Sequence, residues 1–261
     1  MKFYLLMALC FWPTLAFSNL QVFPTKIELS SREKSSSVTL RNRSDKVTTY
    51  QISAVYYRQD IEGRMTRVTD LKEDDFSIID FLRFSPRRVV LKPNQEQVVR
   101  FMVRNTSKLD VGDYRAHIRF EPIEEDITKD GGRDNYVMMK IDAKVAINVP
   151  VIFHQGRAKG EITLESFSIV EDKASGPYFF VTMKRKGRIF PYGTFKIFYQ
   201  KDNEEELVSL VNGVSSYLDE RRFRFNIEDF SKKTGKYILK FYPDEYSKMP
   251  LAQTEYQWKK D

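Results

Sequence analysis

Few side chains in this chain could carry out covalent or metal chemistry. Among its 261 residues only two are histidines, His117 and His154, and neither stands at metal-ligand spacing from another ligand. The single cysteine is Cys10. No Gly-x-Ser-x-Gly elbow and no phosphate-binding glycine loop occurs. We therefore predict a protein that is not an enzyme and that needs no cofactor and no metal. His117 is expected on the surface of a strand and His154 in a linker.

The spacing of apolar residues points instead to binding through a strand. Between residues 135 and 153 every odd position from Val137 to Phe153 is apolar, whereas the even positions are mixed. Side chains alternate faces along a strand, so the pattern predicts one long strand with one apolar face. Ordinary strands have about 5–6 residues, and part of this row could lack a partner in its own domain. A spare apolar row on an extended backbone suits a strand lent to another chain. The alternative is a long structural strand buried at both ends.

The first 18 residues match a secretory signal peptide. Lys2 precedes an apolar run from Phe3 to Phe17, and Ser18 follows as a small residue before the predicted cleavage site. The run is too short for a membrane span, which needs about 20 residues. The alternative is a lipoprotein acylated at Cys10. Since the mature chain then lacks cysteine, we predict an exported protein without disulfides and without a membrane span.

Charge and periodicity describe the rest of the chain. The net charge is +7, but basic and acidic residues are dispersed, which favours a role in solubility over nucleic-acid binding. Short alternating segments bounded by polar turns, without sustained helical periodicity, predict an all-β fold. We expect a signal peptide (1–18), an N-terminal immunoglobulin-like domain (19–153), a linker (154–160) and a C-terminal β-sandwich domain (161–261). The N-terminal strands are expected within Phe23–Leu29, Ser37–Arg43, Thr48–Tyr57, Gln97–Arg104 and Asp113–Pro122, followed by the long strand.

Four blocks of the first domain carry a family resemblance. They are Phe23–Leu29 directly after the signal peptide, Val38–Asn42, Ser85–Arg100, and Gly112–Phe120. The third block resembles a "P, then apolar, then PG-x-x-Q-x-V-R" pattern, with Asn94 in place of the usual glycine. In order and spacing, residues 22–153 resemble the PapD-like periplasmic chaperones of the chaperone–usher pathway. The second domain matches only in place and size.

The resemblance implies a mechanism of strand donation. In this family two immunoglobulin-like domains meet at an angle, and the chaperone inserts its long strand into the open groove of a pilus subunit that lacks its last strand. Basic residues in the cleft between the domains anchor the terminal carboxylate of the subunit. By resemblance, the donor row in this chain is Val137, Met139, Ile141 and Val145, and the anchor is formed by Lys26 and Arg115, with Arg100 as a weaker candidate. Pro150 stands where the family has a lysine.

Together these features predict a periplasmic chaperone that binds pilus or fimbrial subunits and passes them to an outer-membrane usher. Without a subunit, such a chaperone is expected to hide its apolar strand either by self-association or by disorder near residues 121–136. The alternative is a secreted β-sandwich adhesin or surface structural subunit, which would satisfy its long strand internally.

Overall fold

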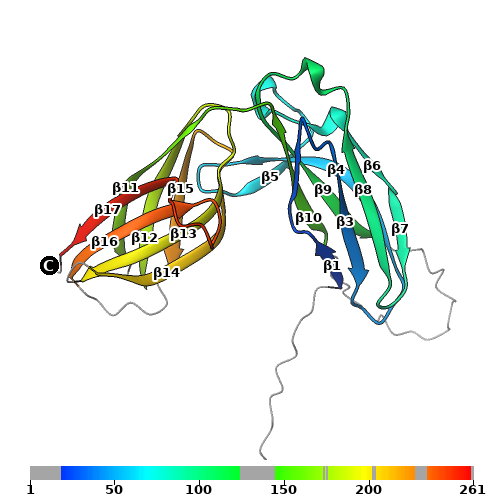
Figure 1. Cartoon of the computed structure of the whole chain (residues 1–261). Helices are drawn as coiled ribbons and strands as arrows, with labels where there is room; N and C mark the ends of the chain where they lie inside the picture. The colour runs from blue at the N-terminus through cyan, green and yellow to red at the C-terminus, as the bar shows by residue number, and fades with distance from the viewer. Residues whose placement is uncertain are drawn as a thin grey trace, which may run out of the picture.

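The computed structural model describes residues 19–123, 145–172, 174, 176–201, 204–226 and 234–259. Two β-domains meet at an angle and give the molecule the shape of a bent elbow (Figure 1). The all-β fold with two immunoglobulin-like sandwiches meeting at an angle is therefore confirmed. The predicted signal peptide lies outside the described residues. Within these ranges, no helix is long and apolar enough to cross a membrane.

The N-terminal domain is a sandwich of two sheets. One sheet has the order β1-β3-β8-β6, and the other has the order β2-β10-β9-β4-β5, with β7 also paired to β4. The strands of this domain are β1 (Leu20–Phe23), β2 (Ile27–Ser30), β3 (Ser35–Asn42), β4 (Thr48–Gln59), β5 (Met65–Val68), β6 (Leu82–Ser85), β7 (Arg88–Leu91), β8 (Glu96–Val103), β9 (Gly112–Ile123) and β10 (Ile147–Gln155).

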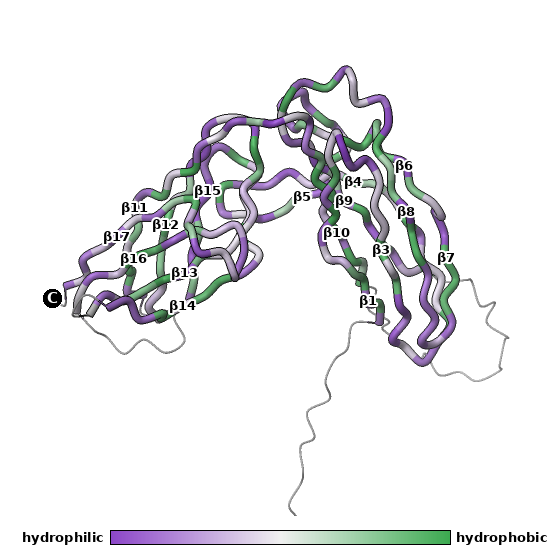
Figure 2. Tube along the Cα trace, in the orientation of Figure 1, coloured by the Kyte–Doolittle hydropathy of each residue, from purple (hydrophilic) through white to green (hydrophobic). Residues whose placement is uncertain are grey.

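Alternation along the strands builds the core of this domain. Val38 and Leu40 of β3, Tyr50 and Ile52 of β4, and Phe101 of β8 are each at most 1% exposed and belong to one cluster. Figure 2 shows the corresponding change between hydrophobic and hydrophilic residues along these strands. Since side chains on a strand point alternately to opposite faces, the residues between them are left on the outer faces of the two sheets.

The expected opening strand is divided between the two sheets. β1 pairs with β3, whereas β2 pairs in parallel with β10. The break falls at Pro24, which has no backbone N–H to donate to a ladder. The predicted strand over Phe23–Leu29 is therefore two short strands, and the second of them brings Lys26 to the sheet that faces the other domain.

The predicted long strand is described only in its last part. β10 runs from Ile147 to Gln155, and residues 124–144 lie outside the described residues. Within β10 the odd row belongs to the domain's own core, because Val149, Val151 and Phe153 are at most 2% exposed. β10 also includes His154 and Gln155, so the connection to the second domain comprises residues 156–160.

The C-terminal domain is a second sandwich. Its sheets have the orders β11-β12-β15 and β14-β13-β16-β17. Phe179, Phe195, Phe241 and Trp258 are among the buried residues of its core. Its strands are β11 (Glu161–Asp172), β12 (Gly176–Lys186), β13 (Tyr192–Lys201), β14 (Glu204–Ser215), β15 (Glu220–Asn226), β16 (Gly235–Tyr242) and β17 (Ala252–Trp258).

Candidate functional site

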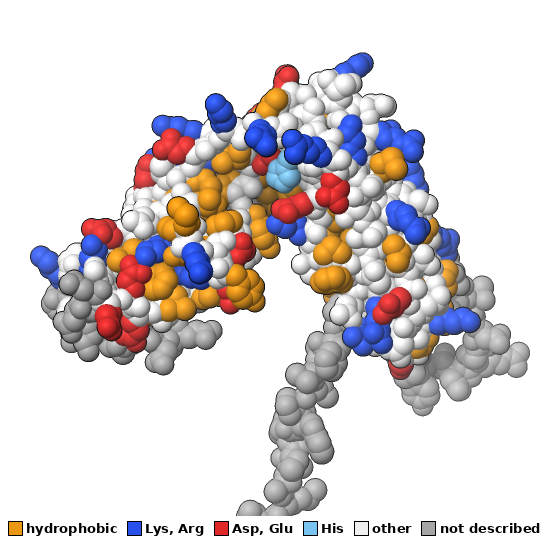
Figure 3. Space-filling view, viewed as in Figure 1, with side chains coloured by type: hydrophobic (Ala, Val, Ile, Leu, Met, Phe, Trp, Pro, Cys, Tyr) orange, Lys and Arg blue, Asp and Glu red, His pale blue; other side chains and the backbone are white. Residues whose placement is uncertain are grey.

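The candidate site lies at the elbow, on the outer face of β9. Tyr114 and Ala116 point into the core of the first domain, so Arg115 and His117 point the other way. Arg115 contacts Phe190 and Tyr217 of the second domain. In the space-filling view, basic, acidic and histidine side chains gather at the hollow where the two domains meet (Figure 3).

Aromatic rings from both domains surround the guanidinium of Arg115. Its Cζ atom lies 4.2 Å from the ring centroid of Tyr56 and 4.3 Å from that of Tyr217. Nη1 donates a hydrogen bond of 2.6 Å to the carbonyl oxygen of Tyr57, whereas the buried Nε has no hydrogen-bond partner among the described residues. Only 3% of Arg115 is exposed, and burial lowers the pKa of its guanidinium. The group nevertheless stays charged, because an arginine side chain does not deprotonate in proteins.

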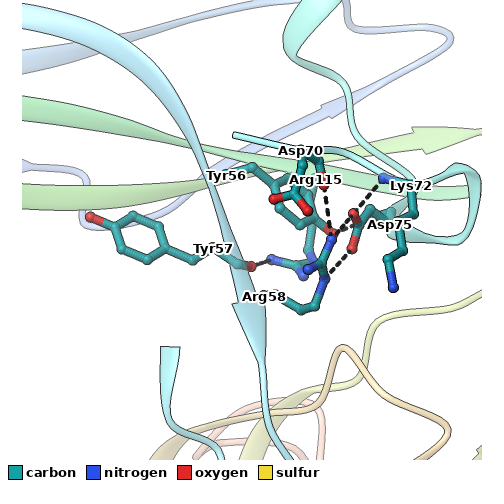
Figure 4. Close-up of polar contacts among 7 residues, drawn as sticks. All are labelled: Tyr56, Tyr57, Arg58, Asp70, Lys72, Asp75 and Arg115. Carbon is teal, nitrogen blue, oxygen red and sulfur yellow. Dashed lines mark hydrogen bonds and ion pairs between the residues drawn. The ribbon is translucent and has the colours of Figure 1, made fainter. Parts of the chain in front are cut away.

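The acid whose charge acts on Arg115, Asp75, is already paired with another arginine. Arg58 donates to both oxygens of Asp75, at 3.0 Å from Nε and 2.6 Å from Nη2, as Figure 4 shows. This pairing lowers the pKa of Asp75. In the part of the chain that the structure describes, no carboxylate forms an ion pair with Arg115. Burying an uncompensated charge costs free energy. A fold that keeps such a cation at a domain junction is a candidate for binding an anion.

Lys26 lies on the same face of the sheet, two strands away. Ile152 of β10 pairs with Glu28 on one side and with Arg115 on the other, so Lys26 lies two strands across and two residues along from Arg115, which puts their backbones roughly 12 Å apart. The ammonium of Lys26 pairs with Glu28 at 2.7 Å and lies 3.5 Å from the ring centroid of Tyr192. Both cations expected in the anchor thus contact a tyrosine of the second domain.

Arg100 is not brought to the elbow. It lies on β8, between Ser37 of β3 and Ser85 of β6, on the exposed face of the other sheet. The structure thus brings Lys26 and Arg115 together and separates Arg100 from them.

The expected positions of both histidines are wrong. His117 is buried, and its ring meets that of Tyr57 edge-on at 5.1 Å. Burial, together with the charge of Arg115, lowers the pKa of His117 to about 4. His154 lies on β10, where its Nδ1 is 2.7 Å from Oδ1 of Asp113, and this contact raises its pKa. The pattern of a single strand could not reveal that both faces of β9 are buried here.

Asp113 fastens the two domains together at the elbow. Its Oδ2 accepts the backbone N–H of Phe190 at 2.7 Å, and its own N–H donates to the carbonyl oxygen of Arg188 at 2.9 Å. The guanidinium of Arg188 lies 4.3 Å from the ring centroids of Phe76 and Tyr114. These contacts fix the loop before β13 against β9, beside Arg115.

The hairpin of β4 and β5 makes a second connection. The side-chain oxygen of Gln59 accepts the N–H of Tyr217 at 2.9 Å, and the carbonyl oxygen of Ile61 accepts the N–H of Arg222 at 2.8 Å. At the tip, Gly63 has φ +85°, and a Cβ there would lie 2.0 Å from the guanidinium of Arg221. The hairpin therefore holds Tyr217 against Arg115.

Residues of the second domain complete this site, and they were missed in the sequence. Phe190, Tyr192 and Tyr217 belong to no recognisable pattern, and each acts through contacts with the first domain. Nothing in the sequence indicates that these aromatic residues contact Lys26 and Arg115, which lie more than 70 residues away along the chain.

The chain was compared with known proteins. No protein-family model matches it, and no curated protein matches it. Among solved structures, it is similar to a chaperone–tip adhesin complex of CFA/I fimbriae biogenesis, with a TM-score of 0.48, 13% identity and coverage of 92% of this chain and 98% of that chain. The chain is similar to fimbrial chaperones. At such identities the likeness concerns the fold alone.

Two further structures show the same coverage. The class 5 fimbriae chaperone CfaA has a TM-score of 0.47 at 13% identity, over 92% of this chain and 98% of that chain. The CsuC–CsuE chaperone–tip adhesion subunit complex of Acinetobacter baumannii has a TM-score of 0.46 at 11% identity, again over 92% and 98%.

The expected donor row falls largely outside the described part of the chain. This applies to Val137, Met139 and Ile141, whereas Val145 is described and is 70% exposed. β2 pairs with β10 only from Val151 to His154, so Ile147–Pro150 have β9 on one side and no described strand on the other. Among the described residues, this edge of β10 has no partner strand where the chain enters from residue 145, and we call it the open edge.

Proposed function

We propose that this protein is a periplasmic chaperone of pilus or fimbrial subunits, which donates the strand containing residues 137–145 and passes the subunit to an outer-membrane usher. The observation that carries the proposal is the buried guanidinium of Arg115, which has no carboxylate partner among the described residues. The resemblance of the four sequence blocks and the open edge of β10 support it.

A terminal carboxylate would supply the anionic partner that Arg115 lacks among the described residues. A guanidinium presents its N–H donors in a planar fork that matches the two oxygens of a carboxylate. The ring faces of Tyr56 and Tyr217 cover the guanidinium from the sides. A subunit that ends at the elbow would bring its anion to the edge of this fork, with Lys26 on the same face of the sheet.

Strand donation would then extend from this anchor along β10. Fully burying a side chain such as Val, Met or Ile contributes about 1.5–3 kcal/mol. Val137, Met139 and Ile141 would together contribute about 5–9 kcal/mol to a complex. Backbone hydrogen bonds along the open edge of β10 would set the register of the subunit.

The donor row is tested by placing charges in it. The double substitution Met139→Asp and Ile141→Asp is expected to abolish the soluble complex with a co-expressed subunit, because each carboxylate would enter an apolar pocket. Lys140→Asp introduces the same side chain on the opposite face and is the matched control. If the subunit stays soluble and bound at unchanged levels with the double variant, the strand-donation mechanism is wrong.

The anchor is tested separately. Subunit peptides that end in a free carboxylate are expected to bind more tightly than the same peptides with an amidated end, and Arg115→Ala is expected to remove the difference. Equal binding of both peptides to the unmodified protein would overturn the anchor role. It would leave strand donation standing. A secreted structural subunit, the alternative, would bind neither peptide.

A further inference from the structure

A groove crosses the exposed face of the sheet opposite the elbow. It spans β3, β8 and β6 of the N-terminal domain and has a volume of about 740 Å³. This size is within the range of small-molecule sites, about 300–1,000 Å³. Its lining includes Ser35, Ser37, Ser85, Phe84 and Met102, together with three arginines. Nothing in the proposed chaperone mechanism uses this face.

The three arginines line the groove near Met102, and Nη1 of Arg83 also donates hydrogen bonds to the carbonyl oxygens of Asp80 and Leu82 at 2.8 and 2.9 Å. Nε of Arg104 lies 3.1 Å from the sulfur of Met102. Arg83 of β6 is directly opposite Met102 in the ladder, and Arg100 lies two residues before it on the same face of β8. Neighbouring positions of this kind have Cβ atoms within about 8 Å of one another, which is within reach of arginine side chains.

Arg100 has room around it. Its neighbours across both ladders are serines, Ser37 on β3 and Ser85 on β6. Small hydroxyl side chains leave the guanidinium uncovered and supply further hydrogen-bond donors.

The charge of the groove is unbalanced. In the described part of the chain, none of its three arginines forms an ion pair with a carboxylate, and Glu33 is the only acid in the lining. By contrast, Arg41 on the same sheet pairs with Glu96 at 3.4 Å. A groove with guanidinium and hydroxyl donors and one acid suits a ligand that is rich in acceptor oxygens.

We propose that this groove is a binding site for a phosphate group. A phosphate carries several acceptor oxygens on one centre and can accept from more than one guanidinium at once. Met102 provides an apolar surface for whatever body carries the phosphate. The site is independent of the proposed chaperone function, because it lies on the other sheet from Arg115.

Two probes identify the source of the phosphate. Inorganic phosphate is titrated into the purified protein by calorimetry, and vesicles of phosphatidylglycerol are compared with vesicles of phosphatidylcholine by co-sedimentation. Binding of inorganic phosphate indicates a free phosphate ligand. Binding of phosphatidylglycerol vesicles alone indicates a lipid headgroup. If neither probe binds, the proposal is overturned.

Substitutions then locate the site. The double variant Arg83→Gln and Arg100→Gln is expected to weaken binding by at least about tenfold, the effect of losing a charge-assisted hydrogen bond. The double variant Arg83→Lys and Arg100→Lys keeps the charge but loses the planar fork of donors, so an intermediate affinity is expected. Arg41→Gln removes one positive charge from the same sheet outside the groove and should change affinity less than about twofold. If Arg41→Gln weakens binding as much as the double variant, the attraction is only general charge and no site exists.

Discussion

Acidification should destabilise this protein through His117. The pKa of this side chain is about 4 in the folded protein and has an ordinary value of about 6.5 in an unfolded chain. Between these two values the unfolded state binds more protons, so the free energy of unfolding falls as the pH is lowered. Relative to neutral pH, the loss from this one group is about 2 kcal/mol at pH 5 and about 3 kcal/mol at pH 4.

The substitution His117→Phe isolates this effect. A phenyl ring can keep the edge-on contact with Tyr57 and has no nitrogen to protonate or to leave unpaired. Urea unfolding from pH 7 to pH 4.5 should show a steep acid loss of stability in the unmodified protein and a shallower one in the variant. Acidic groups titrate alike in both proteins, so the difference between the two curves reports His117.

His154→Gln is the matched control for this experiment. The folded pKa of His154 is raised, so below about pH 5.5 this side chain is protonated in both the folded and the unfolded states. Its substitution should leave the slope between pH 5.5 and pH 4.5 unchanged. If His117→Phe and the unmodified protein give parallel curves over this interval, the reasoning about a buried neutral histidine is refuted.

Three further outcomes are expected. In urea unfolding, Arg115→Met should keep the free energy of unfolding within about 2 kcal/mol of that of the unmodified protein. The reason is that an apolar side chain of similar length replaces a buried charge without an acidic partner among the described residues. A loss above about 4 kcal/mol would instead show that the guanidinium holds the domains together. His154→Gln should lower the free energy of unfolding below about pH 6.5, and this difference from the unmodified protein should shrink as the pH rises through the raised folded pKa of His154. If urea unfolding shows the same difference in free energy at every pH, the pairing of His154 with Asp113 is contradicted. Phe101→Ala should cost about 3–5 kcal/mol, whereas Phe23→Ala, at a position 72% exposed, should change stability by about 0.5 kcal/mol or less in the same assay.

Alternation in the sequence predicted the long strands because each of them packs one face into the core of its domain. β3, β4, β8 and β9 place every second side chain in the core, and this period appears in the printed sequence. β5 was missed because none of its residues is buried, so no apolar row marks it. β6 and β7 have only four residues each, which is too few for a period to stand out from a loop.

The candidate site was only partly predictable, since half of it comes from the second domain. Arg115 and Lys26 were found through the resemblance of their strands to a known family. The burial of Arg115 depends on Tyr217, which reaches it only because the domains pack as they do. Arg100 carries the same charge on a similar strand, yet it faces away from the elbow, because its strand belongs to the other sheet.

The hairpin of β4 and β5 bears on how the proposed subunit would bind at this elbow. Domains joined only by a short linker usually swing relative to one another. Here the backbone of Ile61 and the side chain of Gln59 form hydrogen bonds to the second domain, which connect the domains at a place other than residues 156–160. Contacts at separate places along the junction limit the swing of one domain against the other. Binding of the proposed subunit would then cost less conformational entropy than binding to two freely swinging domains.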